Sequence, residues 1–246
     1  MNMKMYIVVS LVLLVFADVR GYSQDTARNE YLDAAIRAFQ QAVEKNPRHA
    51  EAHYNLGIAY SEKGMSEDAI SEYKKTLEID PNFVKAYNNL GVLYYEAGRL
   101  DEAAETLKKA ITASPRYTEA HYNLGIVYYG KKQYPDAVAA FKKAVELNPK
   151  FEKGYYNLGV TYAALDAVDE SLAAFRKTVE IDPKYSDAYY NMGIAYTKKD
   201  LTDEAIKSLQ KALELNPNDD KSHFALGVIY QSKRKAKASG GKLEKP

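Results

Sequence analysis

Histidine can bind a metal ion or act as an acid or base, and three of the four histidines share one register. His53, His121 and His223 are separated by multiples of 34 residues. Zinc needs its imidazole ligands at about 2 Å, and residues whole repeats apart do not share such short bonds. At other copies of this register the chain carries an aromatic residue, at Tyr87, Tyr155 and Tyr189. We therefore interpret these histidines as core-packing residues and expect no metal site.

No other grouping of reactive residues has the spacing of a catalytic site. The chain has no cysteine, which excludes disulfides, cysteine-ligated zinc and a cysteine nucleophile. It contains no HExxH, P-loop, GxGxxG or Ser-His-Asp context, and Gly240-Gly241-Lys242 lacks the P-loop spacing. We expect a non-enzymatic protein without a cofactor.

A seven-residue stretch, Tyr54-Asn55-Leu56-Gly57-Ile58-Ala59-Tyr60, returns every 34 residues. Its copies begin at Asn88, Tyr122, Tyr156, Tyr190 and, more loosely, Phe224. Prolines keep the same period, at Pro47, Pro81, Pro115, Pro149, Pro183 and Pro217. A fixed period in this range is typical of a solenoid built from stacked units.

Each period contains two amphipathic runs separated by a short break. Proline ends the second run because it cannot continue a helix and biases the preceding residue away from helical geometry. The second run often begins with acidic residues such as Asp101 and Glu102, which suit the positive end of a helix dipole. The pattern predicts helix A, a turn, helix B and a proline, in full repeats at 50–83, 84–117, 118–151, 152–185 and 186–219. Residues 29–49 match only a helix B, and residues 220–233 match only a helix A.

This pattern resembles the tetratricopeptide repeat (TPR) family, over nearly all of residues 30–230. With positions counted from Ala50, the family places a large residue at 4, Leu-Gly at 7 and 8, tyrosine at 11, alanine at 20 and 27, an aromatic at 24 and proline at 32. The third repeat supplies all of them, at His121, Leu124, Gly125, Tyr128, Ala137, Phe141, Ala144 and Pro149. Departures include Thr76 and Thr178 at position 27 and Ser171 at position 20. The resemblance implies an all-α, right-handed α-solenoid of tandem TPR helix-turn-helix repeats over residues 24–233.

Residues 1–23 have the build of a secretory signal peptide. Lys4 precedes an almost wholly apolar run from Met5 to Ala17, which is shorter than the roughly 20 residues of a membrane-spanning helix. Cleavage after Ala17 or after Ser23 would fit, and an uncleaved N-terminal anchor is the alternative. We expect a protein exported to the periplasm or outside the cell, or held at the membrane by this segment.

Charge is unevenly distributed along the chain. Residues 231–246 carry six basic groups and one acidic group, while the chain after Ser23 as a whole has 32 of each sign. The repeats are therefore mildly acidic, which does not suit nucleic-acid binding. The basic residues of 234–246, predicted to form a disordered tail, suggest contact with anionic lipid or an acidic partner; a solubilising extension of the last helix explains them equally well.

Helical geometry divides each copy of the repeated stretch. Positions 4, 7, 8 and 11 lie on one face, which must pack on helix B, while positions 5, 6 and 9 are left over. In TPR proteins helix A lines a concave groove that commonly holds a partner peptide. The resemblance therefore implies a peptide groove that contains a ladder of amides beside an aliphatic stripe, edged by tyrosines. Its residues are Asn55, Ile58, Asn89, Val92, Asn123, Ile126, Asn157, Val160, Asn191, Ile194, Tyr122 and Tyr156.

Two readings of this surface stay open. An amide offers two donors and one acceptor and can pair with any peptide backbone, which favours an adaptor that binds a peptide segment of a partner protein. The same asparagines could instead support packing between repeats. The second functional hypothesis is a self-assembling structural TPR protein that organises an envelope complex, because a helix A without its helix B leaves apolar surface to be shared.

Overall fold

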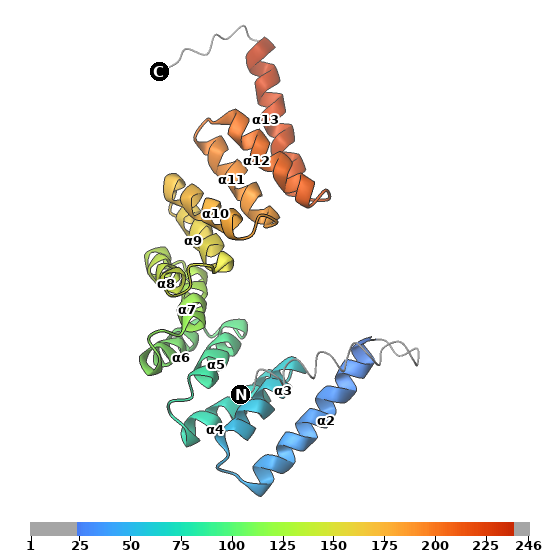
Figure 1. The fold of residues 1–246 in the computed structure, drawn as a ribbon, viewed down its shortest axis with the longest axis vertical. Coiled ribbons are helices and arrows are strands. Elements are labelled where there is room, and N and C mark those ends of the chain that lie inside the picture. Colours follow the sequence, from blue (N-terminus) through green and yellow to red (C-terminus); the bar gives the residue numbers. More distant parts are fainter. Residues whose placement is uncertain (1–23, 239–246) are drawn as a thin grey trace. The chain divides into compact units, whose positions relative to one another are not determined.

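The computed structural model describes residues 24–238, and all the regular structure in this range is α-helical (Figure 1). The predicted signal peptide lies outside the described residues. The helices are α2 (Gln24–Lys45), α3 (Ala50–Glu62), α4 (Ser66–Ile79), α5 (Val84–Glu96), α6 (Leu100–Ala113), α7 (Thr118–Gly130), α8 (Tyr134–Leu147), α9 (Glu152–Ala164), α10 (Val168–Ile181), α11 (Ser186–Lys198), α12 (Thr202–Leu215) and α13 (Asp220–Ala238).

The helices pack pairwise as tandem helix-turn-helix repeats, which confirms the predicted fold class. The five A–B pairs are α3–α4, α5–α6, α7–α8, α9–α10 and α11–α12. The structure groups the chain into two compact units. Unit 1 extends to Pro115 and unit 2 begins at Arg116.

Each B helix ends two residues before the repeated proline. In the first repeat the residue between the helix end and the proline is Asp80, whose backbone is extended, with φ −127° and ψ 94°, as the following Pro81 requires. The Asp80 side chain accepts a hydrogen bond from the backbone N–H of Asn82 at 2.9 Å. Asn148 and Asp182 make the same turn in unit 2. The prolines thus separate the repeats as predicted.

The turn from helix A to helix B needs one residue with left-handed backbone geometry. Unit 1 uses glycine for it, at Gly64 (φ 78°) and Gly98 (φ 74°). Unit 2 uses Lys132, Asp166 and Asp200, with φ between 57° and 59°. A side chain costs roughly 1–2 kcal/mol in this conformation. The turn is therefore imposed by the packing of the two helices and does not depend on glycine.

Glycine at position 8 allows helices A and B of one repeat to approach closely. A Cβ added at Gly125 would lie 2.6 Å from the Phe141 ring, and one at Gly57 would lie 2.7 Å from the Tyr73 ring. Real Cβ atoms do not come this close, so the bulky residue at position 24 occupies the space that glycine leaves. Positions 20, 24 and 27 form the centre of each full repeat and are at most 1% exposed in all five.

The last helix is longer than predicted. We expected it to end at Lys233, but α13 continues to Ala238 and includes the first residues of the predicted disordered tail. Alanine, lysine and arginine are strong helix formers, and cations stabilise a helix C-terminus. Residues 239–246 lie outside the described residues.

Candidate functional site

In unit 1, three of the four predicted amide and aliphatic residues line a pocket that is formed by two successive A helices and one B-helix residue. Asn55 and Ile58 lie on α3, Asn89 and Val92 lie on α5, and all four are half-buried. The pocket has a volume of about 240 Å³. Its lining residues are Ile58, Ser61, Glu62, Tyr73, Asn89, Val92, Leu93 and Glu96. The structure thus brings three of the four predicted unit 1 residues together.

Two carboxylates that sequence reasoning missed belong to this pocket. Glu62 and Glu96 both occupy position 13 of their repeats, and both are exposed. Within the described part of the chain, neither forms an ion pair or a hydrogen bond. In unit 2 the same position holds Gly130, Ala164 and Lys198. The signal was present in the sequence as an acidic residue confined to the first two repeats, at the last residue of helix A.

In unit 2, the remaining predicted residues lie on the three successive A helices α7, α9 and α11. The asparagines at position 6 and the aliphatic residues at position 9 are all half-buried, as are Tyr122 and Tyr156. These residues are Asn123, Ile126, Asn157, Val160, Asn191 and Ile194. We call this set, with Tyr122 and Tyr156, the unit 2 ladder.

The asparagines bind the tyrosine of the preceding repeat. Asn157 Nδ2 donates a hydrogen bond to the Tyr122 hydroxyl at 2.8 Å, and Asn191 Nδ2 donates to the Tyr156 hydroxyl at 3.3 Å. In unit 1, Asn89 Nδ2 lies 3.3 Å from the Tyr54 hydroxyl in the same arrangement. These bonds join position 6 of one repeat to position 5 of the repeat before it. The reading that asparagines support packing between repeats therefore has direct structural support.

Aromatic packing fixes the tyrosines that accept these bonds. The Tyr122 ring lies 4.8 Å from the Phe151 ring and 5.8 Å from the Phe141 ring, measured between centroids. Tyr156 packs in the same way on Tyr185 and Phe175. Burial raises the pKa of the Tyr122 hydroxyl, and the hydrogen bond from Asn157 partly offsets this rise. Each hydroxyl is thus held at a fixed place beside the next A helix.

The amide oxygens keep some capacity for a ligand. Asn191 uses both N–H donors, one on the Tyr156 hydroxyl and one on the Asp187 carbonyl at 2.8 Å. Among the described residues, none donates a hydrogen bond to Oδ1 of Asn157 or Asn191. An amide oxygen has two lone pairs, so each can accept an N–H from a bound backbone. The unit 2 ladder therefore offers acceptors more readily than donors.

The histidines have packing roles at the start of helix A. His53 is buried; its Nδ1 lies 2.6 Å from Glu72 Oε2 and its Nε2 lies 3.0 Å from the Pro47 carbonyl oxygen. His223 Nε2 makes the corresponding contact with the Pro217 carbonyl at 2.9 Å. Over residues 24–238, no three histidine or acidic side chains gather closely enough to hold a metal ion.

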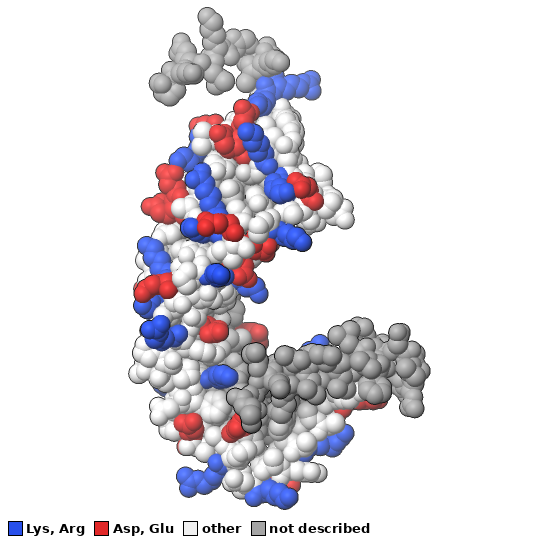
Figure 2. All heavy atoms as spheres, viewed as in Figure 1, with Lys and Arg blue, Asp and Glu red and all other residues white. Residues whose placement is uncertain are grey.

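Basic and acidic side chains are interspersed on the face shown in Figure 2, and neither sign gathers into one large patch there. The helices that the structure describes include none with the length and apolar character needed to cross a membrane.

The chain belongs to the tetratricopeptide repeat family. Family profiles described as tetratricopeptide repeat match residues 25–82, 66–118, 88–151 and 122–186, then 186–219 and 208–242. The family consists of repeat scaffolds that bind protein or peptide partners and are typically non-enzymatic. The predicted family is thus confirmed.

Solved structures show the same relationship. The chain is 30% identical to YrrB, described as a TPR protein with an unusual peptide-binding site, with a TM-score of 0.68 over 78% of this chain and 100% of that one. It is 36% identical to MamA, with a TM-score of 0.64 over 68% of this chain and 97% of that one. Pseudomonas aeruginosa pilF, at 20% identity, shares the fold with a TM-score of 0.67 over 84% of this chain and 99% of that one. No curated protein matches significantly.

Proposed function

We propose that the protein is an exported, non-enzymatic adaptor that binds an extended peptide segment of a partner protein along its A helices. The observation that carries the proposal is the unit 1 pocket, where Ile58, Asn89 and Val92 meet two exposed carboxylates. The 30% identity to YrrB, whose description includes a peptide-binding site, supports this class of ligand.

The residues of the pocket suggest which peptides fit. Ile58 and Val92 offer apolar contact to one side chain of an extended peptide. Glu62 and Glu96 carry negative charge that no described residue neutralises, so a lysine or arginine in the peptide would find a partner there. Amide acceptors on the unit 2 ladder suit main-chain N–H groups and make little demand on sequence. Single hydrogen bonds contribute only about 0.5–1.5 kcal/mol, so affinity has to come from several contacts together.

Peptide binding can be tested with variants that leave the repeat packing intact. The probes are fluorescent extended peptides that contain an apolar residue followed by lysine, and matched peptides with glutamate in place of lysine. We expect fluorescence polarisation to show preferential binding of the lysine peptides. The double variant Glu62→Gln/Glu96→Gln should weaken that binding about 10-fold, as expected for the loss of charge-assisted contacts, with an unchanged melting temperature.

A matched control removes the same charge elsewhere in unit 1. Glu44 and Glu78 are exposed on the B-type helices α2 and α4, away from the pocket. Glu44→Gln/Glu78→Gln should bind the lysine peptides like the unmodified protein. Equal binding of lysine and glutamate peptides, or equal loss in both double variants, would contradict the proposed pocket.

Export is the second part of the proposal, supported by the apolar segment that follows Lys4. Cell fractionation should place the protein outside the cytoplasm. Mass spectrometry of the purified mature chain should then find a new N-terminus at Asp18 or Gln24, while an intact N-terminus in the membrane fraction would indicate the anchor instead. Recovery in the cytoplasm would contradict export.

A further inference from the structure

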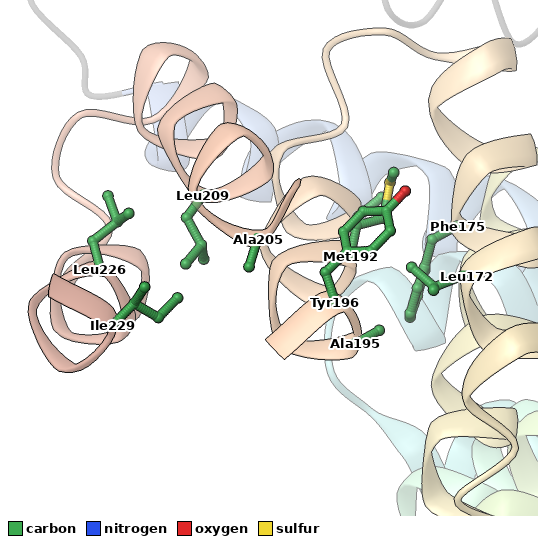
Figure 3. Close-up of a cluster of buried hydrophobic side chains, with 10 residues drawn as sticks. Leu172, Phe175, Met192, Ala195, Tyr196, Ala205, Leu209, Leu226 and Ile229 are labelled. Carbon is green, nitrogen blue, oxygen red and sulfur yellow. The ribbon is translucent and has the colours of Figure 1, made fainter. Parts of the chain in front are cut away.

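Helix α13 is an A helix on whose B-facing side the described residues place no helix B. Leu226 and Ile229 are buried and point toward α12, the B helix of the preceding repeat (Figure 3). Gly227 stands at position 8, where a Cβ in the five full repeats would collide with the residue at position 24. At Gly227 the added Cβ would meet no described atom within 4 Å. The space that this glycine leaves for a B helix is therefore unfilled among the described residues.

A large aromatic side chain is exposed on this helix. Phe224 is 75% exposed and is the most exposed large apolar side chain that the structure describes. Phe224 occupies position 5, whose tyrosines in other repeats pack on the position 24 residue of their own helix B. The centroid distance is 5.7 Å for Tyr54–Tyr73 and 5.8 Å for Tyr156–Phe175. Phe224 thus occupies a packing position, but the described residues include no position 24 side chain for it to pack on.

Helix α2 has the opposite defect, since it is a B helix for which the described residues include no helix A. Its Ile36 packs on α3, as a B helix packs on the next repeat. Ala38 occupies position 23, which is buried in all five full repeats, and Ala38 is exposed. The residues at positions 20, 24 and 27, Ala35, Phe39 and Ala42, are half-buried, against at most 1% exposure in the full repeats. The face of α2 on which a helix A would pack is therefore exposed, as the B-facing side of α13 is.

The two helices also match in length and charge. In a repeat, the C-terminal end of helix A lies beside the N-terminal end of helix B. α13 extends past the usual end of helix A, and α2 begins before the usual start of helix B. Lys233 and Asp33 already form ion pairs with Asp203 and Lys63 of the same chain. Beyond them, residues 234–238 carry three basic groups and no acidic group, whereas residues 24–32 carry two acidic groups and one basic group. The two extensions are thus oppositely charged and would lie side by side.

We propose that α13 of one copy and α2 of a second copy pack together and complete a further tetratricopeptide repeat. Gly227 receives Phe39 of the second copy, Phe224 packs on the same ring, and the two charged extensions lie along each other. Helix order then continues without a break, from α12 and α13 into α2 and α3 of the next copy. Because the two surfaces differ, the contact is head-to-tail and repeats from copy to copy.

The test uses one blocking substitution on each surface. Gly227→Arg and Ala38→Arg both alter exposed positions, so each variant should keep the helicity and melting temperature of a dilute wild-type sample. Light scattering of the purified protein from low to high micromolar concentration should show the average mass rising above the 27.7 kDa of one chain. Each blocked variant should stay at one chain mass, with its dissociation constant raised about 100-fold or more, as for a central interface residue.

Mixing the two blocked variants tests whether the contact between α13 and α2, and no other contact, causes assembly. Gly227→Arg keeps an intact α2 surface and Ala38→Arg keeps an intact α13 surface, so an equimolar mixture should form a dimer and stop there. Ser232→Arg and Gln41→Arg are the controls, because position 13 is exposed in every full repeat and position 26 carries lysine in all five. Both should assemble like wild type. Added salt should weaken assembly because the extensions attract by charge.

Several outcomes would overturn the proposal. These are a wild-type protein that stays at one chain mass at every concentration, blocked variants that still assemble, or a blocked pair that stays monomeric while wild type assembles. Phe224→Asp serves as a second α13 variant, since its exposed side chain can be changed without disturbing the fold. The inference goes beyond the peptide-binding proposal, and Glu62→Gln/Glu96→Gln should leave assembly unchanged.

Discussion

The amide of Asn157 donates a 2.8 Å hydrogen bond to the hydroxyl of Tyr122, a residue one repeat earlier in the chain. Since Tyr122 also packs on Phe141 and Phe151, this bond connects the aromatic centre of one repeat to the A helix of the next. The same pair recurs as Tyr156–Asn191 and Tyr54–Asn89. Residues expected to serve a ligand thus also hold neighbouring repeats together.

A double-mutant cycle on Tyr122 and Asn157 should measure this connection. Tyr122→Phe and Asn157→Ala each remove one partner, and we expect each to lower the free energy of unfolding by about 1 kcal/mol, with a coupling energy of similar size. Urea denaturation followed by circular dichroism gives these values. Tyr190→Phe is the control, because the next A helix carries Ala225 in place of asparagine. Additive single effects would show that the bond contributes nothing.

Two glycines at the same position of their repeats should respond oppositely to alanine. Gly125→Ala places a Cβ 2.6 Å from Phe141, and overpacking of this kind typically costs about 1–3 kcal/mol. Gly227→Ala meets no described atom within 4 Å and gains the helix preference of alanine, about 0.5–1 kcal/mol. Thermal unfolding of dilute samples should therefore show a lower midpoint for the first variant and an equal or higher midpoint for the second. Similar shifts in both would contradict the close-packing role.

The buried pair of His53 and Glu72 should be more important for stability than the exposed His223. His53→Ala leaves the Glu72 carboxylate buried, with Lys75 at 2.7 Å as its remaining described partner. We expect a loss of roughly 1–3 kcal/mol, since the buried carboxylate loses its hydrogen bond to His53 and keeps only Lys75.

The control and the rescue variant both follow from the structure. His223→Ala, on an exposed side chain, should change the unfolding free energy by less than about 0.5 kcal/mol. Glu72→Ala should recover part of the stability lost in His53→Ala, because it removes the buried carboxylate that has lost one of its two partners. A double variant less stable than His53→Ala would contradict this account of the pair.

Periodicity in the sequence was sufficient to predict the fold because each repeat is defined by local signals. Pro81 and its copies end helix B, and Gly57 with Tyr73 requires one specific helix–helix contact. Other features depended on three-dimensional packing. The Tyr122–Asn157 bond needs two side chains from different repeats in particular rotamers, although their 35-residue spacing is visible in the sequence. The division into two units after Pro115 was not predicted. It follows the one full repeat in which position 5 is not tyrosine but asparagine, Asn88.

The binding surface was predictable only as a set of positions. Helical geometry identified Asn89 and Val92 as residues not needed for packing within a repeat, and the structure places both in the unit 1 pocket with Ile58. Asn55, by contrast, does not line that pocket. Glu62 and Glu96 were missed because they lie at the last residue of their helices, where a charged side chain usually signifies only a solvated helix end.

Unit 2 should lose stability in alkali through its half-buried tyrosines. Burial, together with the nearby Tyr156 and Tyr122, raises the pKa of Tyr185 to about 12. In the unfolded chain tyrosine ionises near pH 10, so between about 10 and 12 the unfolded state releases the proton first. The contribution of Tyr185 to the free energy of unfolding should therefore be fully present below pH 10 and be lost as the pH rises toward 12. Denaturation curves and tyrosinate absorbance across this range test the prediction. Tyr185→Phe should show a shallower decline, and parallel declines in both proteins would assign the effect elsewhere.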